Sequence, residues 1–312
     1  MRGVHSVVDE IRRNVFTEVA RLAYEGGDLN RVDMIPYKLV PGEIAHYRHD
    51  VFLERAVVAA RVRLALGMDL APGKPRSALS DQIQEAATDQ KYFEEPLVNI
   101  IPFACNACPP KQIRITDSCQ GCISHPCMNV CPKDAIYLDK DKHCHIDQDK
   151  CIKCGKCFSQ CPYHAISKIE RPCAAACGMD AIGSDELGRA KIDYDKCVSC
   201  GMCLVNCPFA AIADKSQILQ VITAMQRNEE VIACVAPAFV GQFGKEANPG
   251  QAQGRYAAAW LCGRGGGRHW RGPLHRGGGQ GLFGGGTGKA ALYGHVLLPR
   301  LVGYGQEALP GV

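Results

Sequence analysis

The sequence of 312 residues predicts an α+β protein, with a helical N-terminal segment followed by a compact cysteine-rich region. Two observations carry this prediction. Residues 1–98 contain no cysteine and place apolar residues at three- and four-residue intervals, which is the helical period. Seventeen of the nineteen cysteines then lie between Cys105 and Pro208. The apolar content of 46% is ordinary, so a chain of this length can bury a core and form more than one domain.

The N-terminal segment is expected to be a helical leader, a module for capping or docking. A first helix is predicted over Val4–Tyr24, before the stop signal Gly26-Gly27, and a second over Glu43–Leu66. A linker runs from Pro72 to Ser77, and Asp81–Phe93 is the third candidate helix. Isolated histidines on amphipathic helices are usually surface or packing residues, and three are interpreted in this way: His5, His46 and His49.

Two cysteine runs share the spacing C-x2-C-x2-C-x3-C-P, Cys151–Pro162 and Cys197–Pro208. This spacing resembles that of bacterial ferredoxins. There, three close thiolates hold one 4Fe-4S cluster, and the fourth, before proline, reaches a neighbouring cluster. Structural zinc is the weaker alternative for these runs, because zinc sites typically use separated C-x2-C pairs. Gly155 and Gly201 lie inside the runs and suit a close approach of the backbone to a cluster.

The cysteine pattern also repeats. Six cysteines recur 46 positions later, because the set Cys127, Cys131, Cys151, Cys154, Cys157 and Cys161 returns as Cys173, Cys177, Cys197, Cys200, Cys203 and Cys207. Their flanks recur too, since His145–Cys151 matches Lys191–Cys197. We therefore predict two ferredoxin units in tandem over residues 99–212.

If the fourth cysteine of each run binds the neighbouring cluster, as in ferredoxins, the first unit holds two clusters. One is bound by Cys119, Cys122, Cys127 and Cys161, and the other by Cys131, Cys151, Cys154 and Cys157. In the second unit the counterparts of Cys119 and Cys122 are Ala165 and Lys168, so two ligands are missing locally. The upstream pair Cys105-x2-Cys108 has the right spacing to replace them. The third predicted set is thus Cys105, Cys108, Cys173 and Cys207, and the fourth is Cys177, Cys197, Cys200 and Cys203.

Two to four 4Fe-4S clusters are therefore expected, with four as the best count, and all sixteen cysteines act as iron ligands. For the Cys105–Cys108 pair, a zinc knuckle with Cys173 and Cys177 or an incomplete site remains open. Cys144 fits no run and is interpreted as a spare thiol. The wide first run resembles the four-cluster electron-transfer subunits of molybdopterin oxidoreductases.

Charge and cysteine usage exclude several classes of protein. The first 252 residues carry 29 basic and 31 acidic groups, so the net charge of +4 does not indicate a nucleic-acid partner. An odd cysteine count, ferredoxin spacing and a charged segment from Met1 to Phe16 in place of a signal peptide argue against a secreted disulfide framework. No apolar run is long enough to span a bilayer. We expect a reduced, anaerobic cytoplasm.

Residues 213–251 are predicted to begin a further domain, with a helix over Asp214–Asn228 and a buried strand over Val231–Ala236 that contains Cys234. The stretch Val231–Gly244, VIACVAPAFVGQFG, resembles the entry to the catalytic domain of iron-only (FeFe) hydrogenases. The cysteine-free leader resembles a subgroup of the same family. The resemblance implies the electron-relay part of a hydrogenase. The cysteine motifs that hold the H-cluster in that family are absent, so no catalytic residue and no hydrogen chemistry are expected.

Residues 252–312 are expected to be disordered, since from Gln253 they hold eighteen glycines and a single acid, Glu307. A second explanation is off-frame translation of a GC-rich gene. After a one-base shift, the bases encoding His295–Val302 can spell Thr-Ser-Cys-Cys-Pro-Ala-Trp, a motif of the same hydrogenase family, and Cys262 would then be an off-frame residue. A genuine glycine-rich tail is the alternative.

The predicted function is electron transfer through 4Fe-4S clusters to or from a redox partner protein, a ferredoxin or an oxidoreductase subunit. The alternative is a free-standing polyferredoxin subunit whose leader docks onto another oxidoreductase. A zinc-binding structural module is the third possibility.

Overall fold

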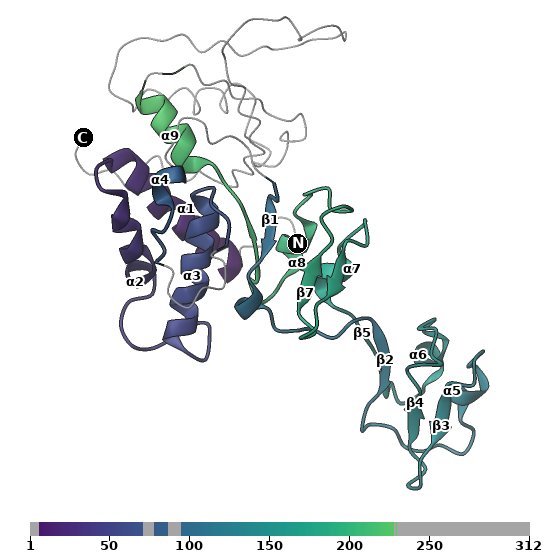
Figure 1. Cartoon of the computed structure of the whole chain (residues 1–312). Coiled ribbons are helices and arrows are strands. Elements are labelled where there is room, and N and C mark those ends of the chain that lie inside the picture. The colour runs from purple at the N-terminus through teal and green to yellow at the C-terminus, as the bar shows by residue number, and fades with distance from the viewer. Residues whose placement is uncertain (1–5, 71–77, 87–94, 228, 230–312) are drawn as a thin grey trace, which may run out of the picture. The chain divides into compact units, whose positions relative to one another are not determined.

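The computed structural model describes residues 6–70, 78–86, 95–227 and 229. It is a mixed helix and strand structure that divides into two compact units (Figure 1). The helical unit comprises the described residues of 11–97 and those from 215 onward, and the cysteine-rich unit contains residues 98–214, with which residues 6–10 are grouped. The predicted strand over 231–236, the stretch 231–244 and the tail 252–312 lie outside the described residues.

The first predicted helix is confirmed as α1 (Val7–Glu25), but the second begins later than expected. Helix α3 spans Val51–Ala65, because the Asp50 carboxylate accepts hydrogen bonds from the Phe52 and Leu53 backbone N–H groups, both at 3.1 Å, and so caps its start. The preceding bends hold His46 and His49 exposed. A 3-10 helix (Leu29–Met34) and α2 (Ile35–Leu39) were not predicted. Of the third predicted helix the described residues contain α4 (Ile83–Ala86), and residues 87–94 and His5 lie outside them.

The core of the helical unit includes a helix that the sequence assigned to a different domain. Helix α9 (Ile218–Gln226) buries Leu219 and Ile222 to 2% and 5% exposure, in one apolar cluster with Val19 of α1 and Val62 of α3. The division predicted at residue 213 lies close to the one at residues 214–215, and the apolar face of α9 packs against the leader. The further domain over 213–251 stays a prediction. Gln217 is the N-cap of α9 and makes no side-chain capping bond, while the hydroxyl of the preceding Ser216 accepts a hydrogen bond from the Ile218 N–H at 3.3 Å.

Shortening a buried side chain of α9 should destabilise the helical unit. Replacing Leu219 with alanine is expected to lower its free energy of unfolding by roughly 2–5 kcal/mol, because the side chain is fully buried. Thermal unfolding followed by circular dichroism measures the change. Val221→Ala on the same helix, at a half-buried position, is the control and should cost less. Equal effects of the two substitutions would contradict the placement of α9 in this core.

The cysteine-rich unit contains four two-stranded antiparallel sheets within its described residues. They pair β1 (Val98–Ile100) with β8 (Ile212–Asp214), β2 (Gln112–Ile115) with β5 (Ile166–Ile169), β3 (Ile136–Leu138) with β4 (Cys144–Ile146), and β6 (Ile182–Ser184) with β7 (Ala190–Ile192). A 3-10 helix (Pro102–Ala104) and four short helices complete it: α5 (Pro126–Asn129), α6 (Lys156–Gln160), α7 (Pro172–Ala175) and α8 (Met202–Asn206).

The 46-residue repeat is visible in the backbone, but the two ferredoxin-like units are nested. The elements β3, β4, α5 and α6 recur as β6, β7, α7 and α8. Strands β2 and β5 close an inner unit, residues 112–169, whereas β1 and β8 close an outer unit, residues 98–108 and 170–214. The inner unit is inserted between two segments of the outer one. The predicted tandem order is refined accordingly, because the outer unit begins upstream of the inner one.

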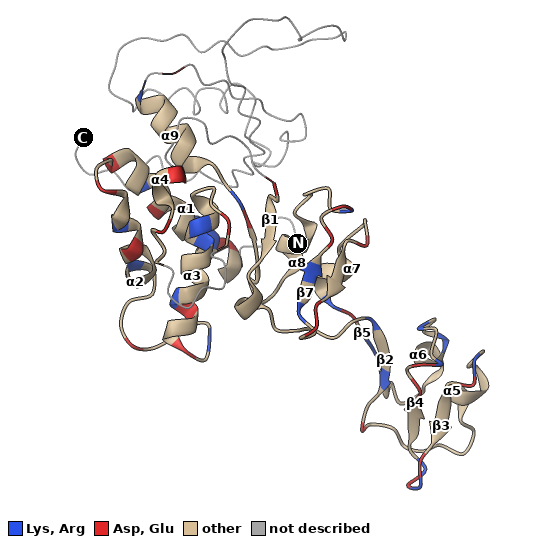
Figure 2. Cartoon of the chain, viewed as in Figure 1, with Lys and Arg blue, Asp and Glu red and all other residues tan. Residues whose placement is uncertain are grey.

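Acidic and basic residues are interspersed over the described elements of both units (Figure 2). Among the described helices, none combines the length and apolar character needed to cross a membrane.

Candidate iron–sulfur sites

The four C-x2-C pairs that begin with Cys105, Cys119, Cys151 and Cys197, the first pair of each predicted ligand set or run, adopt the same turn. In each pair the residue just before the second cysteine has a left-handed backbone, with φ between 45° and 57°: Ala107, Gly121, Lys153 and Ser199. Three of these are not glycine, and a left-handed backbone costs such residues on the order of 1–3 kcal/mol. Conformations of this kind persist where the surroundings impose them, often at binding sites. The Cys105–Cys108 pair thus has the local geometry of the other three.

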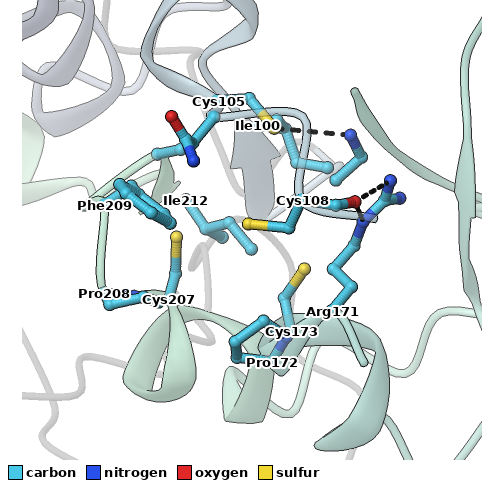
Figure 3. A pocket seen from close by; sticks show the side chains of 13 residues that line it. Ile100, Cys105, Cys108, Arg171, Pro172, Cys173, Cys207, Pro208, Phe209 and Ile212 are labelled. Carbon is cyan, nitrogen blue, oxygen red and sulfur yellow. Dashed lines mark hydrogen bonds between the residues drawn. The ribbon is translucent and has the colours of Figure 1, made fainter. Parts of the chain in front are cut away.

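Four predicted ligands line a hollow in the outer unit, which we call the outer hollow: Cys105, Cys108, Cys173 and Cys207 (Figure 3). Its volume is about 340 Å³, and Ile100, Phe209 and Ile212 supply apolar walls. The first two cysteines follow β1, while the others lie on α7 and at the end of α8. Segments that are distant in sequence therefore bring four thiols to one place.

The inner unit contains a second hollow, of about 330 Å³, which we call the inner hollow and which is lined by Cys131, Cys151, Cys154 and Cys157. These four cysteines form the second predicted ligand set. Gly155 starts α6 beside this hollow with φ +78°, and a Cβ atom there would lie 2.7 Å from the Lys168 side chain. The flexible end of Lys168 could move aside, so glycine is favoured at position 155 by its left-handed backbone.

Some members of the other two predicted sets also lie close together. In the inner unit Cys119, Cys127 and Cys161 belong to one apolar cluster, and Cys122 contributes to the raised pKa of Cys127. In the outer unit Cys197 and Cys200 act in the same way on the pKa of Cys203. In the described part of the chain, no three His, Cys, Asp or Glu side chains converge as ligands of a single metal ion.

Each predicted set contains one buried cysteine on a short helix: Cys127 on α5, Cys157 on α6, Cys173 on α7 and Cys203 on α8. Burial raises the pKa of the Cys203 thiol to about 12 and that of Cys173 to about 11. The same cause raises the pKa of Cys127 and Cys157. Iron binds the thiolate, so cluster binding must release these protons and offset their cost.

Backbone N–H groups point at several of the predicted ligand sulfurs. Ala135 donates to Cys131 Sγ at 3.3 Å and, 46 residues later, Ala181 donates to Cys177 Sγ at 3.4 Å. Two further N–H groups donate at 3.4 Å, from Lys153 to Cys151 Sγ and from Ala190 to Cys105 Sγ. Hydrogen bonds to ligand sulfurs are a main determinant of iron–sulfur potentials. The thiol sets and these donors fit 4Fe-4S clusters.

Cys144, predicted as a spare thiol, is 3% exposed and lies within the inner unit's apolar cluster. Its Sγ atom is 3.8 Å from that of Cys127, a member of the first predicted set. Burial raises the pKa of Cys144 to about 12, and Cys127 adds to the shift. The corresponding residue of the outer unit, 46 positions later, is Ala190. The repeat thus places a thiol beside one predicted site and a methyl group beside its counterpart.

Replacing Cys144 with alanine should lower the reduction potential of the cluster on the first set and leave the iron content unchanged. A thiol donor facing a ligand sulfur stabilises the more negative, reduced state. If this weak hydrogen bond is worth roughly 1 kcal/mol, the shift is on the order of 40 mV for a one-electron couple. Redox titration followed by electron paramagnetic resonance (EPR) measures it. Loss of iron in this variant would instead identify Cys144 as a ligand.

Sequence reasoning missed the strand that starts the outer unit, although a signal for it exists. The pair Cys105–Cys108 precedes Cys119–Cys122 by 14 residues, and β1 precedes β2 by the same interval. The left-handed residues Ala107 and Gly121 are also 14 apart. This second repeat, of 14 residues, shows that the Cys105–Cys108 pair follows a strand of its own, β1, as Cys119–Cys122 follows β2.

Comparison with known families agrees with this geometry. Residues 145–167 match the 4Fe-4S binding domain, and residues 167–218 match the LdpA Fe-S cluster-binding domain. Together these matches cover much of the inner and outer units from β4 to the start of α9.

Curated relatives carry iron–sulfur functions in their names. The chain is 45% identical over 53 residues to an iron–sulfur subunit of the Frd operon of Proteus vulgaris, covering 17% of this chain and 33% of that protein. It is 43% identical over 47 residues to the thiosulfate reductase electron transfer subunit PhsB of Salmonella typhi, covering 15% and 24%. For the electron transport protein HydN of Escherichia coli K12, identity is 43% over 53 residues, covering 17% and 30%. The matches thus span a third or less of these relatives, and within that span the chain carries ferredoxin-type 4Fe-4S domains similar to those of iron–sulfur electron-transfer subunits.

Proposed function

We propose that this chain is an electron relay that holds four 4Fe-4S clusters on sixteen cysteines, in the four sets described above. The observation that carries the proposal is the left-handed turn shared by the Cys105–Cys108 pair and the pairs that begin with Cys119, Cys151 and Cys197. When bound, a 4Fe-4S cluster supplies one-electron redox chemistry.

The protein's own residues have three tasks in this function. The cysteines on α5 to α8 and in the C-x2-C turns hold each cluster from different segments. Buried isoleucines, such as Ile113, Ile136 and Ile212, keep water away from the sites. Backbone N–H groups directed at the sulfurs set the potentials. These residues determine the potential of each site and do no bond chemistry on a substrate.

The partner is proposed to be a ferredoxin or a catalytic oxidoreductase subunit. PhsB and HydN are named for electron transfer, which favours the second option, a relay subunit that serves a separate enzyme. The hydrogenase origin rests on the stretch 231–244 and on the tail, which lie outside the described residues. We retain it as the proposed ancestry of the chain.

Metal and sulfide analysis of the anaerobically reconstituted full chain tests the function. We expect iron and acid-labile sulfide in near-equal amounts, EPR signals of reduced 4Fe-4S clusters, and reversible one-electron reduction. Zinc in place of iron, or iron without sulfide, would overturn the proposal. Resequencing the gene around the codons for residues 250–312 tests the ancestry separately, because the off-frame explanation requires bases that spell Thr-Ser-Cys-Cys-Pro-Ala-Trp.

A further inference from the structure

Arg171 occupies the one place where the two repeats must differ. In the inner unit Cys119 and Cys122 directly precede α5, so the chain passes from the pair to the helix without interruption. In the outer unit the pair Cys105–Cys108 is separated from α7 by the whole inner unit. Something must therefore hold the upstream pair against the outer unit. Position 125 of the inner unit, a histidine, corresponds to Arg171 of the outer unit.

The same carbonyl group is bonded in both repeats, but by different donors. In the inner unit the backbone N–H of His125 donates to the Cys122 carbonyl oxygen at 3.3 Å, and His125 has a left-handed backbone with φ +40°. In the outer unit the corresponding carbonyl, that of Cys108, accepts from the Arg171 side chain, from Nε at 2.9 Å and Nη2 at 2.7 Å. Arg171 itself has an extended backbone, φ −64° and ψ 119°. In the outer unit, hydrogen bonds from the Arg171 side chain thus replace the local backbone hydrogen bond that the inner unit makes at this carbonyl.

The guanidinium also reaches the rest of the outer unit. Nη1 donates to the Gly183 carbonyl of β6 at 2.5 Å, and Nη2 donates to the Gly188 carbonyl in the following turn at 2.8 Å. Arg171 therefore joins the Cys105–Cys108 segment to the β6–β7 hairpin. The planar fork of arginine suits this, because it presents several donors in a fixed geometry that lysine lacks.

The charge of Arg171 is buried beside the outer hollow. The residue is 3% exposed and lines the hollow with Cys108 and Cys173 (Figure 3). Its four hydrogen bonds end on neutral carbonyl oxygens, so they do not cancel its positive charge. A thiolate-bound cluster becomes more negative on reduction, and a buried cation nearby favours the reduced state.

We propose that Arg171 is a positioning residue of the site formed by Cys105, Cys108, Cys173 and Cys207. It fastens the upstream pair to the outer unit and raises the reduction potential of the cluster bound there. The proposal rests on the proposed relay function and adds to it a single residue that both completes one site and sets its potential.

The test compares Arg171→Gln and Arg171→Lys with Arg189→Gln in the full chain, by iron content and EPR-monitored redox titration. Arg189 is the matched control, because its Nε bonds Asp185 at 2.7 Å in the same hairpin and it does not line the outer hollow. Arg171→Gln should lose part of the iron, up to the quarter that one cluster contains. Added to the double substitution Cys105→Ser, Cys108→Ser, it should cause no further loss. Arg171→Lys should keep more iron than Arg171→Gln, and Arg189→Gln should keep all of it.

The titration separates the electrostatic role from a merely structural one. In the fraction of Arg171→Gln chains that retains the cluster, one potential should fall, whereas Arg171→Lys, which keeps the charge, should stay nearer the original value. Full iron with unchanged potentials in Arg171→Gln overturns the inference while leaving the relay function intact. Equal iron loss in Arg171→Lys and Arg171→Gln, spread over several clusters, also overturns it, because that result indicates general unfolding. A parent chain without iron and sulfide would overturn the relay function itself.

Discussion

Replacing both Cys105 and Cys108 with serine is expected to remove one complete cluster, a quarter of the bound iron and sulfide. Serine keeps the size of the side chain but lacks the thiolate that iron requires. The two remaining thiols of the set, Cys173 and Cys207, are too few to hold a cluster on their own. Iron and sulfide analysis after anaerobic reconstitution measures the loss, and EPR shows which signal disappears.

Cys144→Ser is the matched control for this experiment. Cys144 is buried in the same cysteine-rich unit and is a cysteine outside the four sets, so its substitution should leave the iron content unchanged. If the double variant retained all its iron, the assignment of the upstream pair to the outer hollow would be wrong. An iron loss larger than a quarter would show that more than one site depends on the pair.

Removing the clusters should unfold the cysteine-rich unit and leave the helical unit folded. The cysteine-rich unit has strands of three or four residues, and its two apolar clusters consist to a large extent of the cysteines themselves. Domains of this kind need metal ligation to offset their conformational entropy. The helical unit instead has a contiguous aliphatic core that includes Val19, Leu66 and Leu219, with no predicted ligand among them.

Amide hydrogen exchange with and without the clusters measures this difference. After oxidative removal of iron under a chelator, peptides from residues 98–214 should lose protection, and those from α1, α3 and α9 should keep it. The intact chain carried through the same buffers without oxidant is the control. Retained protection in 98–214 would mean that the short sheets are stable without iron. Loss in both units would mean that the helical core depends on the clusters.

The grouping of four cysteines at each hollow was predictable from sequence, because iron–sulfur sites impose fixed spacing on their cysteines. That constraint led to the sets whose thiols line the outer and inner hollows. The nesting was not predicted, because β1 is three residues long and its pairing with β8 is set by a contact across more than a hundred residues. Arg171 was missed because the repeat aligns it with His125 but does not show that its side chain reaches the Cys108 carbonyl, 63 residues earlier in the chain.

The helical elements show the same division between local and long-range information. The start of α3 was predictable, since Asp50 is a capping residue directly before the apolar run, but the longer periodic stretch from Glu43 was preferred. The membership of α9 in the leader's core was not predictable, because periodicity shows that a helix has an apolar face and not which partner covers it.

The nested strand pairing has a consequence for the order in which the chain can be completed during synthesis. The inner unit has all its elements once β5 has emerged, the outer unit must wait for β8, and the core of the helical unit must wait for α9. The inner unit is therefore completed first, the outer unit second and the helical core last. Each finished layer brings the ends of the next one together, because a folded insertion shortens the loop that the following contact must close. Iron can be bound in the same order, because the sites of the inner unit can be filled while α9 is still being synthesised.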